Sequence, residues 1–393
     1  MKLLLFYASE IDALGGAELS VLSLAEGLTK RGHQATILEF ARRRSKRRLA
    51  SGITVLSIPR TICPEPGRPG TWLRFSRSVW QFLRIIQELK PDVVSVQFPS
   101  WQSLPVVAAH ALPHKWRLVV TARGSDIRVI PFSLPRLKRW QSRLLEQADA
   151  ISAVSQSLLR DLLNLYPFAS GNACVIHNTI DSKWSEEPAL ETFRLCPERY
   201  VLFVGAFRHV KGIDVLLHAW QRLQGRVPGV SLILVGAGAD LDSVLTLSER
   251  LGVSGSVRFV GAKSRGDLPA LYRDAQLVVV PSRNEGLPRV ALEAGACGAI
   301  CVGSKVGGLP EIIDDQVTGF LVEPESPEML AEAMLHALNL SDEVKQRMSA
   351  AAKRRIRERF DYERMIVTYE QLFQSLLRKG PRNQPMATRR PQG

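Results

Sequence analysis

Short apolar runs alternate with segments of helical periodicity along this chain, and the alternation occurs twice. In the first half, a helical pattern starts at Ala17 and stops at Gly32, and further helical stretches lie between the later apolar runs. The apolar runs that we predict to be strands are 3–8, 35–40, 92–97 and 117–121. Strands that are apolar throughout and separated by helices form parallel sheets covered on both faces.

The second half repeats this pattern, with a helix from Ile213 and predicted strands at 200–204, 231–235, 257–260, 277–280 and 299–302. The fold class is therefore α/β, with two doubly wound Rossmann-like domains facing a central cleft, and ligands are expected at the carboxyl ends of the strands. A polar, Pro-bearing bridge at 181–197 separates the halves. We predict domains at 1–185 and 186–360, a helix at 361–379 and a disordered tail at 380–393.

Composition excludes several protein classes. Hydrophobic residues make up 45% and charged residues 23%, which are ordinary globular values. No apolar run reaches the roughly 18–20 residues of a membrane-spanning helix, and acids at Glu10 and Asp12 do not fit a signal peptide. The five cysteines are scattered, with no Cys-x-x-Cys pair. We expect a soluble cytoplasmic protein without structural zinc, which at most touches the inner face of the cytoplasmic membrane.

The charge is unevenly distributed. Lys and Arg number 52 against 38 Asp and Glu, a net charge of +14. Residues 1–190 carry 25 basic and 15 acidic side chains, a net of +10. This excess points to an anionic partner of the first half: acidic lipid head groups, a phosphorylated acceptor or nucleic acid.

The segment Arg283-Asn284-Glu285-Gly286-Leu287-Pro288, followed by Glu293, carries the strongest chemical signal. It leaves a predicted strand and enters a helix near Pro288, where proline suits the first helical position. Free N–H groups and the positive end of the helix dipole would bind phosphate there. Glu293 lies about 7.5 Å further along the helix axis. Two carboxylates at this spacing suit a ligand with a sugar at one end and a nucleoside at the other. From spacing alone, a helix-entry acid at Glu285 and a solvent-facing Glu293 fit equally well.

These residues resemble the paired-glutamate motif of the GT-B retaining glycosyltransferases of family 4, the "glycosyl transferases group 1" type. The resemblance covers residues 280–324 almost without a break and extends to about residue 375. Other matching segments are Gly15-Gly16-Ala17-Glu18, Val175-Ile176-His177-Asn178 with Asp181, Val204-Gly205 through Lys211-Gly212, and Leu234-Val235-Gly236-Ala237-Gly238.

The resemblance implies an acceptor-binding first domain, a donor-binding second domain and a final helix that crosses back to the first domain. Lys211 would neutralise the donor diphosphate, and Gly205 would approach it closely. Glu285 would lie at the transferred sugar, and Glu293 would bind the ribose hydroxyls. The remaining implied donor contacts are the backbone of Gly286, Leu287 and Pro288, and Gly16 from the first domain. On the acceptor side, the implied residues are Glu18, Arg123 and Ser125.

Two positions depart from the family pattern. Ala206 stands where an Arg often follows the glycine, and Arg208 is the obvious substitute cation, since its fork geometry suits a diphosphate. Arg123 stands where His often precedes Gly-x-Asp, and it cannot accept a proton at ordinary pH. Asp126 keeps the acid position and is the one candidate for a nucleophilic carboxylate in the first half.

The implied reaction moves a sugar from a nucleotide-sugar donor, a UDP- or GDP-sugar, to a glycan or lipid-linked glycan acceptor in polysaccharide or glycolipid biosynthesis. Lys211, Arg208 and the helix N-terminus can steady the departing diphosphate, so we expect no metal and no cofactor. We favour same-face attack over a covalent intermediate on Asp126. The alternative is an inactive nucleotide- or sugar-binding scaffold on the same fold.

Three basic stretches bear on membrane contact. Residues 72–89 form an amphipathic pattern with arginines opposite its apolar face, which packing against a sheet explains better than a membrane interface does. Residues 131–145 are basic and aromatic. Residues 42–48, a block of arginines and lysine, are most simply a solvated loop. Together they lead us to expect peripheral contact with anionic lipid.

Other functions fit less well. Asp240 and Asp242 have metal-ligand spacing, but helix capping and the helix dipole explain them better. Gly236-Ala237-Gly238 lacks the third glycine of a dinucleotide fingerprint, and no hydrolase motif surrounds Ser155 or Ser157. His177 is predicted to be structural. No nucleic-acid-binding module is recognisable, so nucleic acid is not an expected partner.

Overall fold

The computed structural model describes residues 1–7, 15–59, 69–133, 135–180, 184 and 199–379. The chain divides into two compact units, each described here by itself. Unit 1 comprises 1–154, 158–176 and the segment from Glu363; unit 2 comprises 155–157 and 177–362. The division thus falls earlier than residue 185. Most of the predicted bridge at 181–197 and the whole of the predicted tail at 380–393 lie outside the described residues.

Unit 1 is built on an eight-stranded sheet, in the order β3-β4-β2-β1-β5-β6-β7-β8. All neighbours are parallel except β3, which is antiparallel to β4. The strands are β1 (Lys2–Tyr7), β2 (Gln34–Ala41), β3 (Ser45–Arg48), β4 (Thr54–Pro59), β5 (Val93–Gln97), β6 (Arg117–Ala122), β7 (Ala150–Ala153) and β8 (Ala173–Val175). The four strands predicted in this half are confirmed as β1, β2, β5 and β6.

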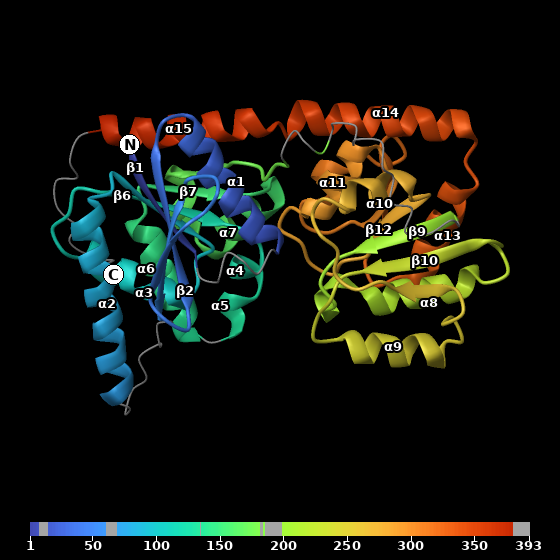
Figure 1. Cartoon of the computed structure of the whole chain (residues 1–393), viewed down its shortest axis with the longest axis horizontal. Helices are drawn as coiled ribbons and strands as arrows, with labels where there is room; N and C mark the ends of the chain where they lie inside the picture. Colours follow the sequence, from blue (N-terminus) through green and yellow to red (C-terminus); the bar gives the residue numbers. More distant parts are fainter. Residues whose placement is uncertain (8–14, 60–68, 134, 181–183, 185–198, 380–393) are drawn as a thin grey trace, which may run out of the picture. The chain divides into compact units, whose positions relative to one another are not determined.

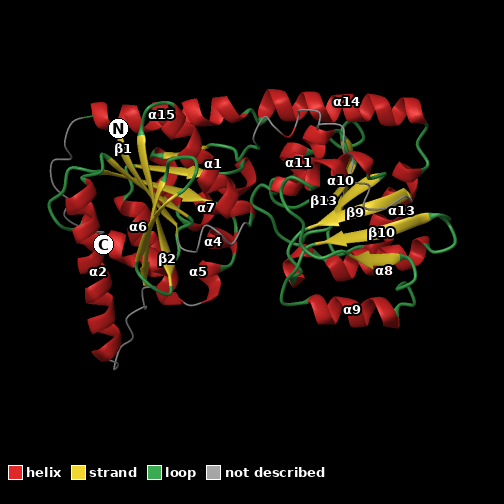
Figure 2. Cartoon of the chain, in the orientation of Figure 1, coloured by secondary structure: helices red, strands yellow, loops and turns green. Residues whose placement is uncertain are grey.

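The helices of unit 1 cover its sheet, as Figure 2 shows. They are α1 (Gly16–Lys30), α2 (Pro69–Leu89), α3 (Leu104–His110), α4 (Ser125–Arg128), α5 (Ile130–Ser133), α6 (Pro135–Gln147), α7 (Gln156–Leu165) and α15 (Tyr362–Arg378). Short 3-10 turns are η2 (Trp101–Ser103) and η3 (Pro167–Gly171). The carboxylate of Glu370 on α15 pairs with Arg31 at 2.7 Å and with His33 at 2.8 Å, which ties this helix to the end of α1.

Unit 2 is built on a parallel six-stranded sheet, in the order β11-β10-β9-β12-β13-β14 (Figure 1). The strands are β9 (Arg199–Val204), β10 (Val230–Val235), β11 (Val257–Phe259), β12 (Leu277–Val280), β13 (Cys301–Ser304) and β14 (Gly319–Val322). The helical elements are η5 (His209–Lys211), α8 (Ile213–Leu223), α9 (Leu241–Arg250), α10 (Leu268–Asp274), α11 (Arg289–Cys297), α12 (Leu309–Ile312), α13 (Pro327–Leu338) and α14 (Asp342–Arg359). Both units are therefore Rossmann-like, as the alternating pattern predicted.

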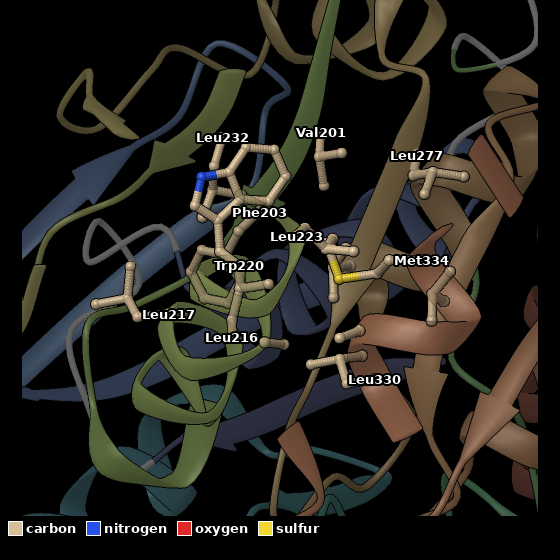
Figure 3. Close-up of a cluster of buried hydrophobic side chains, with 14 of the residues drawn as sticks. Val201, Phe203, Leu216, Leu217, Trp220, Leu223, Leu232, Leu277, Leu330 and Met334 are labelled. Carbon is tan, nitrogen blue, oxygen red and sulfur yellow. The ribbon is translucent and has the colours of Figure 1, made fainter. Parts of the chain in front are cut away.

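Trp220 lies at the centre of the core of unit 2, between α8 and the sheet (Figure 3). Its ring packs among side chains from β9, β10 and α8, and its indole N–H donates to Ser256 Oγ at 3.0 Å. Because this large ring is buried and its N–H keeps a hydrogen-bond partner, α8 is held firmly on the sheet. The helix therefore supports the loop that precedes it.

The basic block at 42–48 was expected to be a solvated loop; this is confirmed for the exposed residues 42–44 and wrong for 45–48. Ser45–Arg48 forms β3, the edge strand of the sheet of unit 1. The block pairs with the sheet because Arg47 reaches Glu39, whose side chain is almost fully buried; Nη1 and Oε1 are 2.6 Å apart. None of the helices in the described ranges is long and apolar enough to cross a membrane.

Candidate active site

In unit 2 the strand order reverses between β9 and β12, which are neighbours in the sheet but not in the sequence. Open α/β sheets bind ligands outside the carboxyl ends of the strands at such a reversal. The loop after β9 carries Gly205, Arg208 and Lys211, and the loop after β12 carries Glu285. The topology thus brings the two predicted donor-binding loops to one place.

Lys211 and Glu285 are in direct contact at this place. Lys211 Nζ lies 2.7 Å from Glu285 Oε1, and Ser282 Oγ donates to the same oxygen at 2.7 Å. The Glu285 side chain is 10% exposed and the Lys211 side chain 29%. An ammonium group has three N–H donors, so Lys211 can hold Glu285 and a phosphate oxygen at the same time.

Gly212 and Arg283 hold these two loops together. Gly212 has φ +66°, and a Cβ atom there would lie 2.0 Å from the carbonyl oxygen of Pro281. The close approach lets Arg283 N donate to Val210 O at 2.9 Å. The Arg283 guanidinium binds both carboxylate oxygens of Asp214 on α8, at 2.8 and 2.7 Å. Burial opposes ionisation of Asp214, but these bonds outweigh it and lower its pKa. The charge of Arg283 is thus used within the scaffold.

The loops after β9 and β10 pass close to each other, and the glycines in these loops leave room for the close approach of the two backbones. A Cβ on Gly236, whose φ is +147°, would lie 1.8 Å from Gly205 O, and one on Gly238 would lie 2.2 Å from Phe207 O. The Gly-x-Gly pattern here is thus explained without a dinucleotide, as predicted. Arg208 lies exposed at the start of η5.

Helix α11 begins at Arg289, one residue later than predicted, and Pro288 is its extended N-cap at φ −71°. The first-turn N–H groups of a helix have no acceptor within the helix. The preceding turn is buried at Gly286, Leu287 and Pro288, and Gly308 N donates to Gly286 O at 3.0 Å. The carbonyl of Gly286 is therefore used within the protein, whereas the α11 N-terminus retains the dipole that favours an anion.

Glu293 is 4% exposed, so a solvent-facing position is excluded. Tyr272 OH donates to its Oε2 at 3.1 Å, and Arg289, four residues earlier on α11, lies 3.4 Å from its Oε1. Burial raises the pKa of Glu293, although Arg289 and Tyr272 oppose the shift. The buried carboxylate thus has two fixed partners and a defined orientation.

In unit 1 the strand order reverses between β1 and β5. Tyr7 and Gln97 end these two strands and are paired in register, and Thr121 of β6 is the next residue across. Gln97 Nε2 donates to Ser95 Oγ at 2.7 Å and to Thr121 Oγ1 at 3.1 Å, which fixes the orientation of its amide. Its Oε1 accepts from Arg123 Nη2. Arg123, which departs from the family pattern, is therefore held by a buried polar network.

Asp126 fastens the loop that carries Arg123. Its carboxylate has no exposed surface and accepts from the backbone N–H of Arg123 at 2.9 and 3.1 Å and of Gly124 at 2.6 Å. Burial raises its pKa to about 6, against the effect of these bonds. Gly124 has φ +148°, a conformation that favours glycine, and Ser125 next to it is exposed. In this conformation Asp126 does not present its carboxylate to a substrate.

At the first helix of unit 1, Gly16 is exposed and is the first residue of α1. Glu18, in the same turn, accepts from Tyr7 OH at 2.8 Å. Burial, the charge of Glu18 and this hydrogen bond raise the pKa of Tyr7. Thus Glu18, Arg123, Ser125, Asp126 and Gly16 all lie in unit 1, at or near the carboxyl end of its sheet.

Sequence reasoning missed Tyr272, Ser282 and Gln97, which support the predicted residues from distant or neighbouring loops. The i, i+4 spacing of Arg289 and Glu293 was a usable signal for one support. His177 was predicted to be structural; its Nε2 lies 3.0 Å from Glu311 and its ring contacts Phe360.

No group of three or more His, Cys, Asp and Glu within the described ranges has the geometry of a metal site. Asp240 is the N-cap of α9 but its side chain makes no capping bond, so that part of our explanation is wrong. Asp242 lies in the first turn of α9, where it complements the helix dipole.

Residues 14–184 match the family described as Glycosyltransferase Family 4, and residues 195–355 match the family described as Glycosyl transferases group 1. An N-acetyl-alpha-D-glucosaminyl L-malate synthase of Bacillus anthracis is 27% identical over 75% of this chain and 77% of its own length. A D-inositol 3-phosphate glycosyltransferase of Salinispora arenicola is 32% identical over 63% of this chain. That match spans only 60% of the relative's own length.

Solved structures share the fold. Sucrose-phosphate synthase from Thermosynechococcus elongatus superposes with a TM-score of 0.83 at 19% identity, over 97% of this chain and all of that chain. Anabaena Alr3699/HepE in complex with UDP-glucose superposes with a TM-score of 0.78 at 21% identity, over 95% of this chain and 99% of that chain.

Proposed function

This chain belongs to the glycosyltransferases of the group 1 and family 4 type, and on that premise we propose that it transfers a sugar from a nucleotide-sugar donor with retention at the anomeric carbon. The observation that carries the proposal is the contact of Lys211 with Glu285 at the strand reversal, beside the N-terminus of α11. The Anabaena neighbour was crystallised with UDP-glucose, which supports a UDP-sugar ahead of a GDP-sugar as the donor.

In the proposed reaction, the bond between the anomeric carbon and the diphosphate oxygen breaks as the acceptor hydroxyl bonds to the same face of that carbon. The acceptor proton passes to the departing diphosphate, which leaves as the nucleoside diphosphate. Lys211, with Arg208 nearby in sequence and the α11 N-terminus, would stabilise the charge that develops on that oxygen. We propose that these groups suffice without a resident metal ion.

The carboxylates have different proposed roles. Glu285, which keeps some exposed surface, would accept from hydroxyls of the transferred sugar, and Glu293 would accept from the ribose. Asp126 is a positioning residue, because its buried carboxylate holds the backbone at Arg123 and Gly124. A covalent sugar intermediate on Asp126 is therefore not part of the proposal.

The acceptor has two candidates. The basic excess of the first half fits a lipid-linked glycan at an anionic membrane, with the protein on the cytoplasmic side. The names of the two sequence relatives include L-malate and D-inositol 3-phosphate, which are small and anionic, and these favour a small acidic acceptor as the second candidate. Both fit a fixed cation such as Arg123 in unit 1.

The test is release of nucleoside diphosphate by the full-length protein from UDP-glucose, UDP-galactose, UDP-N-acetylglucosamine and GDP-mannose. Malate, inositol 3-phosphate and a membrane lipid extract are offered as acceptors. Lys211→Ala should lower the rate by about 100-fold or more, the usual effect of removing one preorganised charge. Lys305→Ala is the matched control, because Lys305 pairs with Glu323 on the surface of the same unit.

Equal turnover by wild type, Lys211→Ala and Glu285→Gln would refute the proposed donor site. Nucleotide binding without release from any donor would instead support the inactive-scaffold alternative. Proton NMR of the product decides the stereochemistry, and an inverted anomeric configuration would refute same-face attack.

A further inference from the structure

Helix α2 exposes large apolar side chains along one face. Trp72 is 48% exposed, Leu73 75% and Trp80 52%. The opposite face of the same helix packs on the sheet, where Phe82 and Ile85 are buried. The packing expected from the sequence is therefore confirmed for one face, but it does not account for these three residues.

Two of the exposed apolar residues and two of the three arginines of α2 share one stripe. Leu73, Arg77, Trp80 and Arg84 follow each other at helical spacings of four, three and four residues, so they lie on one side of the helix. The Arg84 guanidinium lies 3.9 Å from the centroid of the Trp80 ring. The stripe extends over about 16 Å of helix. In Figure 1 the amino-terminal end of α2 extends beyond the other helices of unit 1.

The basic edge strand β3 lies beside the other end of this helix. A cavity of about 160 Å³ lies between them. Its lining includes apolar residues and charged groups: Arg44, Lys46, Leu56, Ile58, Ile85 and Glu88. Arg44 and Lys46 are exposed, so they add positive charge beside the carboxyl-terminal end of α2. The helix itself carries three arginines and one acid.

We propose that this face of α2, defined by Leu73, Arg77, Trp80 and Arg84 with Trp72 at its margin, docks on the surface of a bilayer that contains anionic phospholipid. Tryptophan prefers the boundary between head groups and acyl chains, and arginines beside it are attracted to the negative surface. A helix with this composition on one face lies in the interface plane. The opposite charge of the lipid is what selects a bilayer over an uncharged apolar partner.

The inference deepens the proposed function, since it names the surface that would bring the enzyme to a lipid-borne acceptor, but binding is measured without donor or acceptor. The full-length protein is sedimented with phosphatidylcholine vesicles, with and without phosphatidylglycerol. We expect sedimentation only with phosphatidylglycerol, and its reversal by salt. Combined Trp72→Ser and Trp80→Ser, and separately Arg77→Glu with Arg84→Glu, should each weaken binding about tenfold or more.

Matched controls lie in unit 2. Met329 is 48% exposed and Arg250 is exposed on α9, so Met329→Ser and Arg250→Glu should bind vesicles like wild type. Stabilisation by UDP in a thermal-shift assay tests whether the α2 variants keep a folded donor site. Equal vesicle binding by wild type and α2 variants, or no binding by wild type, overturns the proposal. A dimer that the tryptophan changes convert to a monomer, with vesicle binding unchanged, overturns it as well.

Discussion

Gly212→Ala should destabilise unit 2 by much more than the cost of placing a non-glycine residue in the left-handed region. Any non-glycine residue at φ +66° costs roughly 1–2 kcal/mol. At Gly212 the new Cβ would also lie 2.0 Å from Pro281 O, whereas ordinary contact begins near 3.4 Å. The two loops must therefore separate by about 1 Å or more.

Such a separation has a calculable cost. It breaks the hydrogen bond from Arg283 N to Val210 O, which contributes about 0.5–1.5 kcal/mol, and it strains the contact of Lys211 with Glu285. We expect a total loss of about 3–5 kcal/mol. With a urea dependence of about 2–3 kcal/mol per molar, the unfolding midpoint of unit 2 should fall by about 1–2.5 M.

Gly252→Ala separates the two contributions. Gly252 has φ +69°, close to the value of Gly212, but a Cβ there meets nothing within 4 Å. Urea unfolding followed by circular dichroism should show a shift of only about 1–2 kcal/mol for this variant. Equal shifts for the two variants would refute the reasoning, because the close approach to Pro281 would then carry no energy.

Three further predictions concern the buried polar groups and the final helix. The pKa of Asp126 in the folded protein, about 6, exceeds the ordinary aspartate value. Ionisation of Asp126 should therefore lower the free energy of unfolding by about 3 kcal/mol as the pH rises from about 4 to above 6. Urea titrations at several pH values should show this pH dependence in wild type and lose it in Asp126→Asn. Burial opposes ionisation of Glu370, but its basic partners outweigh this and lower its pKa, so its contribution to folding stability is present above the ordinary glutamate pKa and lost as the pH falls further. Glu370→Gln should therefore lower the melting temperature at pH 7 and not in acid. A difference that persists in acid would contradict the pairing with His33. Tyr272→Phe removes a donor to the buried Glu293 and should lower the free energy of unfolding in urea by about 1.5–3 kcal/mol. UDP should also stabilise this variant less in a thermal-shift assay. An unchanged urea midpoint would show that the hydrogen bond does not contribute to stability.

The predicted strands could be identified because they are mostly apolar runs between helical segments, whereas β4, β7, β8 and β14 were not predicted. Leu277–Val280 was predicted with the bounds that the structure has. Such runs require burial on both faces of a sheet, so their position follows from composition alone. The charged strand β3 could not be predicted in this way, since its Arg47 pairs with the buried Glu39 of β2, two strands away in the sheet.

The candidate site was predictable where one local segment carries it and not where distant segments meet. Glu285 was identified from its own loop, but its neighbour Ser282 has no signal without the turn that joins them. The burial of Glu293 depends on Tyr272 of α10, which periodicity assigns only to a helix. The sequence placed Gln97 at the end of an apolar strand. Its hydrogen bond with Arg123 could be identified only from the structure.

The antiparallel edge strand β3 also bears on how the protein avoids self-association. The outer strand of a sheet offers unpaired backbone groups on which another chain can assemble, and lysine or arginine there discourages such stacking. In this protein the strand that ends the sheet consists of Ser45, Lys46, Arg47 and Arg48. Two copies that approach with their β3 edges would face each other with like charges, so the basic residues of β3 discourage pairing at this edge of the sheet.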